Sequence, residues 1–108
     1  MKTLLLAAGL TAMTTLAHAQ DKPVLTVYTY DSFVTDWGPG PAIEKAFETT
    51  CDCDLQLVAA GDGASLLSRI QLEGARSDAD ILLGLDTNLT ARAKATGLFA
   101  TLSTSPNG

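Results

Sequence analysis

The chain has 108 residues, with 7 basic and 12 acidic side chains that give a net charge of −5 at pH 7. An acidic chain has no electrostatic reason to bind nucleic acid or an anionic lipid surface. Its only histidine, His18, lies in an N-terminal segment that we expect to be removed. Histidine general-base catalysis and histidine-ligated metal sites are then excluded within residues 20–108, and an enzymatic interpretation of this stretch would have to use carboxylates or cysteines.

The first 19 residues have the pattern of a secretory signal peptide. Lys2 gives a positive start, residues 4–16 form an apolar run, and residues 17–19 form a small-x-small cleavage site. The run is too short to span a membrane. We therefore expect cleavage before Gln20, a periplasmic location and no membrane insertion of residues 20–108. Loss of Lys2 leaves six basic residues against 12 acidic ones, a net charge of −6.

A strand is expected at residues 23–30, because apolar or aromatic side chains occupy most positions, as in a strand buried on both faces of a parallel sheet. The loop that follows contains Trp37, the only tryptophan. A helix is then expected at residues 41–50, with Pro41 at its first position. The apolar face of this helix consists of Ile43, Ala46 and Phe47.

Cys51 and Cys53 follow this helix. In an exported protein such a pair can be oxidised to a disulfide, but the closed loop is tiny and adds little stability. The Cys-x-x-Cys helix start that lowers a thiol pKa is missing. We therefore favour a local staple, or two small buried side chains, over a redox site.

A second strand is expected at residues 54–60, followed by a turn and a second helix within residues 61–75. Gly74 is placed to end this helix. The positions that mark the turns of the helix are Leu66, Leu67, Ile70 and Glu73.

A third strand is expected at residues 78–86 and a third helix at residues 87–97. The helix is expected to be capped near Thr87 or Asn88 and closed by Gly97. The apolar residues expected to pack beyond its end are Leu98 and Phe99. Three short strands that alternate with amphipathic helices predict an α/β fold with a parallel sheet in the order β-α-β-α-β-α.

Ligands of open α/β sheets bind beyond the carboxyl ends of the strands. This rule selects the loops after Tyr30, Ala60 and Leu85. The ring faces of tyrosine and tryptophan suit a flat or cationic group, so we interpret Trp37 as a ligand contact and Tyr28 as a core residue. The neighbouring acids that add negative charge are Asp31 and Asp36.

The second of these loops has the sequence Gly-Asp-Gly-Ala-Ser at residues 61–65. Its glycines let the backbone come close to a ligand, and the N–H groups at a helix start favour an anion. The alternative is that Asp62 or Ser65 simply caps the helix, and a lone Gly-x-Gly has low specificity. Asp86, after the third strand, fits an N-cap or turn better than a ligand contact.

Several stretches together resemble the periplasmic thiamine-binding proteins of bacterial ABC importers. They are KPVLTVYTYDSF, DWGPGP, the cysteine pair before a strand, DG-x-SLL-x-R, ADILLGLD-x-NL and TGLFA, and they extend from Lys22 to Ala100. The resemblance implies a periplasmic-binding-protein-like (type II) lobe. It also implies a receptor that captures thiamine, thiamine monophosphate or thiamine diphosphate and delivers it to a membrane permease.

The resemblance also implies site residues. Asp62 and Gly63 match a pair that contacts the ligand in the family, and Tyr30 and Trp37 match positions close to the ligand. The further candidates are Ser65 and Asp86. We expect no catalytic residue, no metal and no cofactor.

Family members are several times longer than this chain. We therefore expect residues 20–108 to be an incomplete first lobe, with the second lobe and hinge absent, and to bind thiamine weakly or not at all alone. Three alternatives stay open: a receptor for another cation, such as a polyamine or a ferric ion complex; a thiol redox protein that uses Cys51 and Cys53, or a carboxylate hydrolase; and a small binding domain that dimerises.

Overall fold

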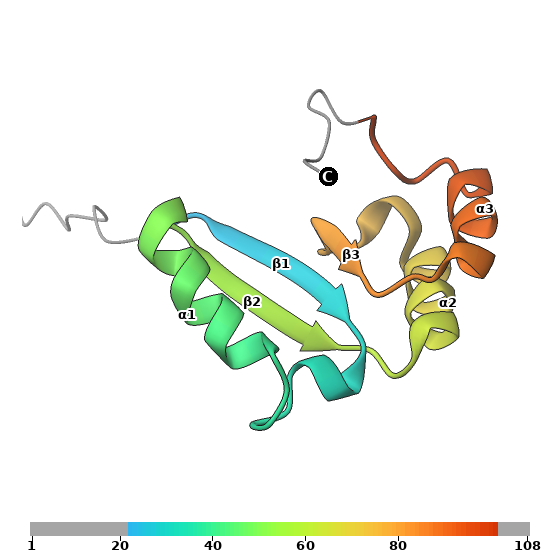
Figure 1. Ribbon diagram of the computed structural model, residues 1–108. Helices are drawn as coiled ribbons and strands as arrows, with labels where there is room; N and C mark the ends of the chain where they lie inside the picture. The colour runs from blue at the N-terminus through green and yellow to red at the C-terminus, as the bar shows by residue number, and fades with distance from the viewer. Residues whose placement is uncertain (1–21, 102–108) are drawn as a thin grey trace, which may run out of the picture.

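The computed structural model describes residues 22–101 (Figure 1). The predicted signal peptide, residues 1–19, lies outside the described residues. The elements are β1 (Val24–Thr29), the 3-10 helix η2 (Asp31–Phe33), α1 (Gly40–Cys51), β2 (Asp54–Ala59), α2 (Gly63–Glu73), the 3-10 helix η3 (Gly74–Arg76), β3 (Ile81–Leu83) and α3 (Thr87–Ala95). The predicted alternation of three strands and three helices is confirmed. No helix within residues 22–101 has the length and apolar character that a membrane crossing requires.

The three strands form one parallel sheet with β1 in the centre, β2 on one side and β3 on the other. β1 pairs with β2 over six residues, but with β3 only from Val27↔Ile81 to Thr29↔Leu83. The third strand is therefore shorter than the predicted residues 78–86. It ends at Leu83, and a φ of +117° at the next residue, Gly84, turns the chain out of the extended conformation.

One face of the sheet is covered by α2 and α3. Its buried cluster consists of Tyr28, Leu66, Leu67, Ile70 and Ala93. Leu66 and Leu67 are 0% and 1% exposed, so the apolar face predicted for the second helix is confirmed. Tyr28 is confirmed as a core residue. Gly74 ends α2, as predicted.

α1 lies on the opposite face of the sheet. A β-carbon at Gly40 would lie 3.1 Å from Cδ1 of Leu57, whereas the next residue, Val58, packs against the α2 cluster. Successive strand residues point to opposite faces, so α1 and α2 cover different sides. The apolar face predicted for α1 is only half covered, since Ile43 and Phe47 are 47% and 42% exposed.

The helix ends differ from the prediction in detail. α1 begins one residue earlier than expected, so Pro41 is its second residue. The cap of α3 is Asp86, whose Oδ1 accepts hydrogen bonds from N–H groups of Asn88 and Leu89 at 2.9 and 3.0 Å. A carboxylate before the helix therefore takes the role expected near residues 87–88. Beyond α3, Leu98 and Phe99 are 39% and 43% exposed, so the packing expected there is loose.

Cys51 and Cys53 form a disulfide between the end of α1 and the start of β2. The bond spans Asp52, which has a left-handed φ of +51°. This confirms the interpretation of the pair as a local staple. It lies at the amino end of β2, away from the loops that follow the carboxyl ends of the strands.

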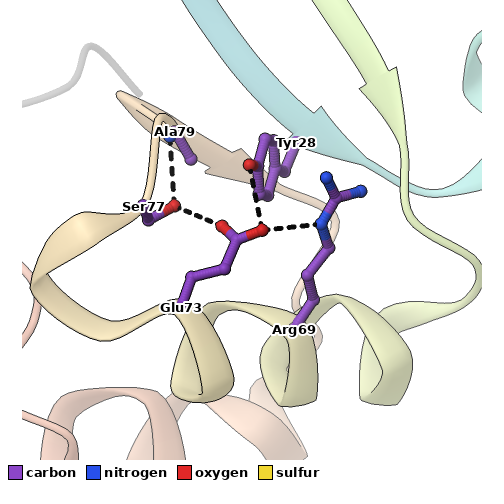
Figure 2. Close-up of polar contacts among 5 residues, drawn as sticks. All are labelled: Tyr28, Arg69, Glu73, Ser77 and Ala79. Atoms are coloured by element: carbon purple, nitrogen blue, oxygen red, sulfur yellow. Dashed lines mark hydrogen bonds and ion pairs between the residues drawn. The ribbon is translucent and has the colours of Figure 1, made fainter.

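At the carboxyl end of α2, Glu73 gathers several polar groups (Figure 2). Its Oε2 accepts hydrogen bonds from the Tyr28 hydroxyl at 3.3 Å and from Nε of Arg69 at 3.0 Å. Its Oε1 accepts from Oγ of Ser77 at 2.7 Å, and that Oγ accepts from the N–H of Ala79 at 3.1 Å. The Arg69 guanidinium also lies 4.3 Å from the centroid of the Tyr28 ring. We call these five residues the Glu73 network; it joins α2 to β1 and to the segment that enters β3.

Candidate ligand-binding site

The loops after the three strands meet at the carboxyl edge of the sheet. The N–H of Asp31 donates to the carbonyl of Gly61 at 2.9 Å, and the N–H of Gly61 donates to Oδ1 of Asp31 at 2.8 Å. The third loop lies against the first, because a β-carbon at Gly84 would be 2.5 Å from Cδ1 of Tyr30. The prediction that these three loops share one edge is confirmed.

These loops border an open hollow of about 590 Å³, which we call the strand-end hollow. It is lined by Tyr30, Asp31, Ser32, Gly61, Asp62, Gly63, Ser65 and Gly84. Small-molecule sites have volumes of roughly 300–1,000 Å³, so the hollow has the size for a ligand such as a vitamin. Four of the predicted site residues line it, and all four come from the first two loops.

Asp62 is both a helix cap and a wall of the hollow. It precedes α2 in an extended conformation, and its Oδ1 accepts a hydrogen bond from the N–H of Ser65 at 2.8 Å. Hydrogen bonds from the backbone and then the side chain of Ser65 lower the pKa of the Asp62 carboxyl. The carboxylate is therefore ionised at neutral pH, so the capping interpretation and a charged wall are compatible.

The glycines of the second loop serve different purposes. Gly61 has a φ of +90°, a conformation that favours glycine. Gly63, the first residue of α2, sits close to the third loop, since a β-carbon there would lie 3.2 Å from the carbonyl oxygen of Gly84 and 3.2 Å from Cδ1 of Leu89. A side chain at position 63 would therefore push the second and third loops apart.

The strand-end hollow is more suited to a cation than to an anion. The backbone N–H groups of Gly61 and Ser65, which could have bound an anion, already donate to the carboxylates of Asp31 and Asp62. Two negative side chains therefore occupy the corner that the loop sequence predicted for an anion. The two carboxylates favour a positive group at residues 61–65, and the anion corner expected there stays a prediction.

The aromatic ring of Tyr30 packs against the ring of Phe33. It meets the Phe33 ring edge-on, with centroids 5.6 Å apart and an angle of 71° between the planes. Phe33 itself is 7% exposed, so it provides a buried support. Tyr30 thus presents an aromatic surface to the strand-end hollow from a defined position.

Two predicted site residues do not line the strand-end hollow. Trp37 is 77% exposed and lies beyond η2, before α1. Asp86 is occupied as the cap of α3, as its alternative interpretation proposed. The other four lining residues were not predicted as site residues, although each lies within three residues of a predicted strand end: Asp31, Ser32, Gly61 and Gly84. Among residues 22–101, no three His, Cys, Asp or Glu side chains are grouped so as to hold a metal ion.

A parallel α/β sheet with a ligand-sized hollow beyond its strand ends is the architecture of a lobe of the periplasmic binding proteins. A solved periplasmic thiamin binding protein matches with a TM-score of 0.71 and 64% identity, over 73% of this chain and 25% of that chain. A Trichodesmium protein, IdiA or FutA, in complex with iron and citrate, matches with a TM-score of 0.64 and 28% identity, over 76% of this chain and 24% of that one. These likenesses confirm the predicted fold class; the finer type II assignment stays a prediction.

The chain is also similar in sequence to curated proteins. The thiamine-binding periplasmic protein of Escherichia coli strain K12 is 65% identical over 79 residues, which are 73% of this chain and 24% of the relative. Those of Salmonella typhimurium and Haemophilus influenzae are 63% and 38% identical, over 78% and 93% of this chain and 26% and 30% of the relatives. No protein-family model matches the chain. The chain is therefore a homologue of the periplasmic thiamine-binding proteins and spans about a quarter of the length of the first of these relatives.

Proposed function

We propose that this chain forms one wall of the thiamine site in the substrate-binding component of an ABC importer. The full receptor would capture thiamine, thiamine monophosphate or thiamine diphosphate in the periplasm and deliver it to a membrane permease. The observation that carries this proposal is the strand-end hollow, where the Tyr30 ring and the carboxylate of Asp62 line one space. The thiazolium ring of thiamine is a flat cation, so it matches both features.

Each predicted residue receives a role in this proposal. Asp62 supplies charge opposite the thiazolium, Gly63 allows close approach of the backbone, and Tyr30 contacts the ring. Ser65 supports Asp62 through its N–H. We place Trp37 at the outer rim, because its ring is 77% exposed, and we assign Asp86 to the α3 cap.

We place the ester phosphate of thiamine monophosphate or diphosphate outside the strand-end hollow. A phosphate is bound best by N–H donors and cations, and the hollow offers two carboxylates instead. The proposal therefore assigns recognition of the cationic end to these loops. It leaves the discrimination among the esters to other parts of the receptor.

A ferric-ion receptor is the second candidate, because the FutA structure shares this fold and contains iron and citrate. An enzyme is disfavoured, since the relatives are binding proteins. A thiol redox role is also disfavoured, because Cys51 and Cys53 are joined in a disulfide at the amino end of β2, far along the strand from the strand-end hollow.

The proposal is tested first on the native secreted product. Its intact mass shows whether it is several times heavier than residues 20–108, and its N-terminus shows whether the signal peptide is cleaved before Gln20. We then expect calorimetric titration to show micromolar or tighter binding of thiamine, with no displacement by spermidine or ferric citrate. Residues 20–108 alone should bind weakly or not at all. Failure of the native product to bind thiamine, or tighter binding of ferric citrate, would overturn the proposal.

A further inference from the structure

The first two loops of the strand-end hollow are joined by a reciprocal pair of hydrogen bonds. Asp31 donates its N–H to the carbonyl of Gly61 and accepts the N–H of Gly61 on Oδ1, at 2.9 and 2.8 Å. The carbonyl of Asp31 also accepts a hydrogen bond from the N–H of Val34 at 3.2 Å, within the turn of η2. A single residue thus holds its own loop in shape and fastens it to a residue thirty positions away.

The residues next to this hydrogen-bonded pair in the chain line the strand-end hollow. Tyr30 immediately precedes Asp31, and Asp62 immediately follows Gly61. The two hydrogen bonds therefore extend the β1–β2 pairing, which continues to the bond from the Ala60 N–H to the Thr29 carbonyl at 2.8 Å, and hold together the backbone beside the aromatic ring and the charged wall. Gly61 has a φ of +90°, a conformation that favours glycine at this position.

We propose that Asp31 is a positioning residue for ligand recognition: its carboxylate holds the loop of Tyr30 against the loop of Asp62. The proposal rests on the proposed thiamine function of the same hollow. Asp31 acts here as a hydrogen-bond acceptor. Its role therefore differs from that of Asp62, which we assign to direct charge contact with the thiazolium.

Two substitutions separate positioning from direct charge contact. Asp31→Asn removes the charge but keeps a side-chain oxygen that can accept the N–H of Gly61. Asp31→Ala removes both. A positioning residue therefore loses its function in the alanine variant and retains most of it in the asparagine variant, whereas a residue that attracts the cation loses its function in both.

The experiment measures two properties of the native secreted product. Calorimetry gives thiamine affinity, and NMR gives the rate at which the Gly61 amide proton exchanges with water. For Asp31→Ala we expect affinity to fall roughly tenfold and Gly61 exchange to accelerate by about the same factor, since a charge-assisted hydrogen bond is lost. For Asp31→Asn we expect both values to stay within about threefold of the wild type.

Asp78→Ala and Asp78→Asn are the matched controls, because Asp78 is an exposed acid before β3, at the opposite end of the strands. Both controls should leave affinity and Gly61 exchange unchanged. Equal losses of affinity for Asp31→Asn and Asp31→Ala would overturn the positioning role in favour of direct charge contact. Unchanged Gly61 exchange in Asp31→Ala would also overturn it.

The outcome also distinguishes this proposal from the proposed function. If the wild-type native product does not bind thiamine, the proposed function fails and the Gly61 exchange rates alone decide whether Asp31 joins the loops. If thiamine binds and both Asp31 variants bind it like the wild type, the receptor function stands and the positioning role is overturned.

Discussion

The two ends of α2 carry acidic side chains in opposite surroundings. At the carboxyl end, both oxygens of Glu73 accept hydrogen bonds from side chains of β1, α2 and the segment before β3 (Figure 2). At the amino end, Asp62 accepts from one backbone N–H and lines the strand-end hollow. A carboxylate whose two oxygens both accept hydrogen bonds from side chains serves to stabilise the fold, whereas a carboxylate at the wall of a hollow has capacity for a ligand.

Both carboxyl groups have a lowered pKa, but for different reasons. The pKa of Glu73 is lowered by hydrogen bonds from Ser77 and then Arg69, which are side-chain contacts from residues four positions away in the chain. The pKa of Asp62 is lowered by the N–H of Ser65 in its own helix. An acid with a lowered pKa is therefore not by itself evidence of a ligand site; the surrounding space decides its role.

The largest expected effect on stability comes from a substitution on the buried side of α2, the helix that carries both acidic side chains. Leu67 is 1% exposed, so Leu67→Ala should lower the free energy of unfolding by about 2–5 kcal/mol. Leu72→Ala, in the same helix but at a position 85% exposed, should change it by less than about 0.5 kcal/mol. Urea unfolding of the two variants checks this, and equal losses would show that the described packing of α2 is wrong.

The next largest effect is expected at the amino end of α2, from a substitution of Gly84 in the third loop. Gly84→Ala places a β-carbon 2.5 Å from Cδ1 of Tyr30 and keeps a φ of +117°. We expect a stability loss of about 1–3 kcal/mol and a loss of thiamine affinity of roughly tenfold or more, because Tyr30 must move.

Gly74→Ala is the matched control at the carboxyl end of α2. Gly74 also has a positive φ, +59°, but no atom lies within 4 Å of its added β-carbon. It should cost stability through backbone strain alone, about 1–2 kcal/mol, and leave thiamine affinity unchanged. Affinity is measured by calorimetry and stability by urea unfolding. A larger loss of affinity in Gly74→Ala than in Gly84→Ala would contradict the assignment of the two ends.

The sequence predicted the parts of this comparison that depend on local pattern. The apolar period of residues 66–70 gave the buried face of α2, and the strand-end rule brought Tyr30, Asp62 and Gly63 together. The Glu73 network was not predictable, because Tyr28 and Glu73 are 45 residues apart and only the fold brings them into contact. The same holds for Asp31 and Gly61, which are 30 residues apart.

The positions at which the structure differs from the expectation have a physical explanation. Trp37 lies after a strand in the sequence, but η2 intervenes and the ring is 77% exposed, outside the strand-end hollow. On α1, the residues nearest the sheet include Glu48, whose Oε2 accepts the N–H of Leu55 at 2.8 Å. Ile43 and Phe47, on the predicted apolar face, stay 47% and 42% exposed. An apolar stripe predicts a helix well, but it does not fix how the helix is rotated against its neighbours.

The charges at the two ends of α2 can be removed separately. Asp62→Asn should lower thiamine affinity roughly tenfold, since the charge opposite the cation is lost, while stability changes little because asparagine is also a good N-cap. Glu73→Gln should leave affinity unchanged and lower the midpoint of thermal unfolding, because the network loses its ionised acceptor. Calorimetry and thermal unfolding of both variants check this. A loss of affinity in Glu73→Gln with unchanged affinity in Asp62→Asn would contradict the roles assigned to the two acids.

The pH dependence of stability should follow from the lowered pKa of Glu73. A lowered pKa in the folded state means that the stabilisation is present above the ordinary glutamate pKa of about 4.3 and is lost as the pH falls through the folded-state pKa. The wild type should therefore lose stability on acidification below this value, and Glu73→Gln should lose less. Urea unfolding from pH 6 down to about pH 3 measures both curves; parallel curves would contradict a role for Glu73.

The smallest effect on the strand-end hollow is expected from the disulfide. Cys51 and Cys53 lie at the amino end of β2, whereas the hollow lies beyond its carboxyl end, so reduction should leave thiamine affinity unchanged. The closed loop is short, and the unfolded-state entropy that it removes amounts to less than about 2 kcal/mol. Titration and urea unfolding, each with and without a reductant, give the two values. A loss of affinity on reduction would connect the staple to the site and restore the redox interpretation, because the bond would then regulate ligand capture from the far end of the strand.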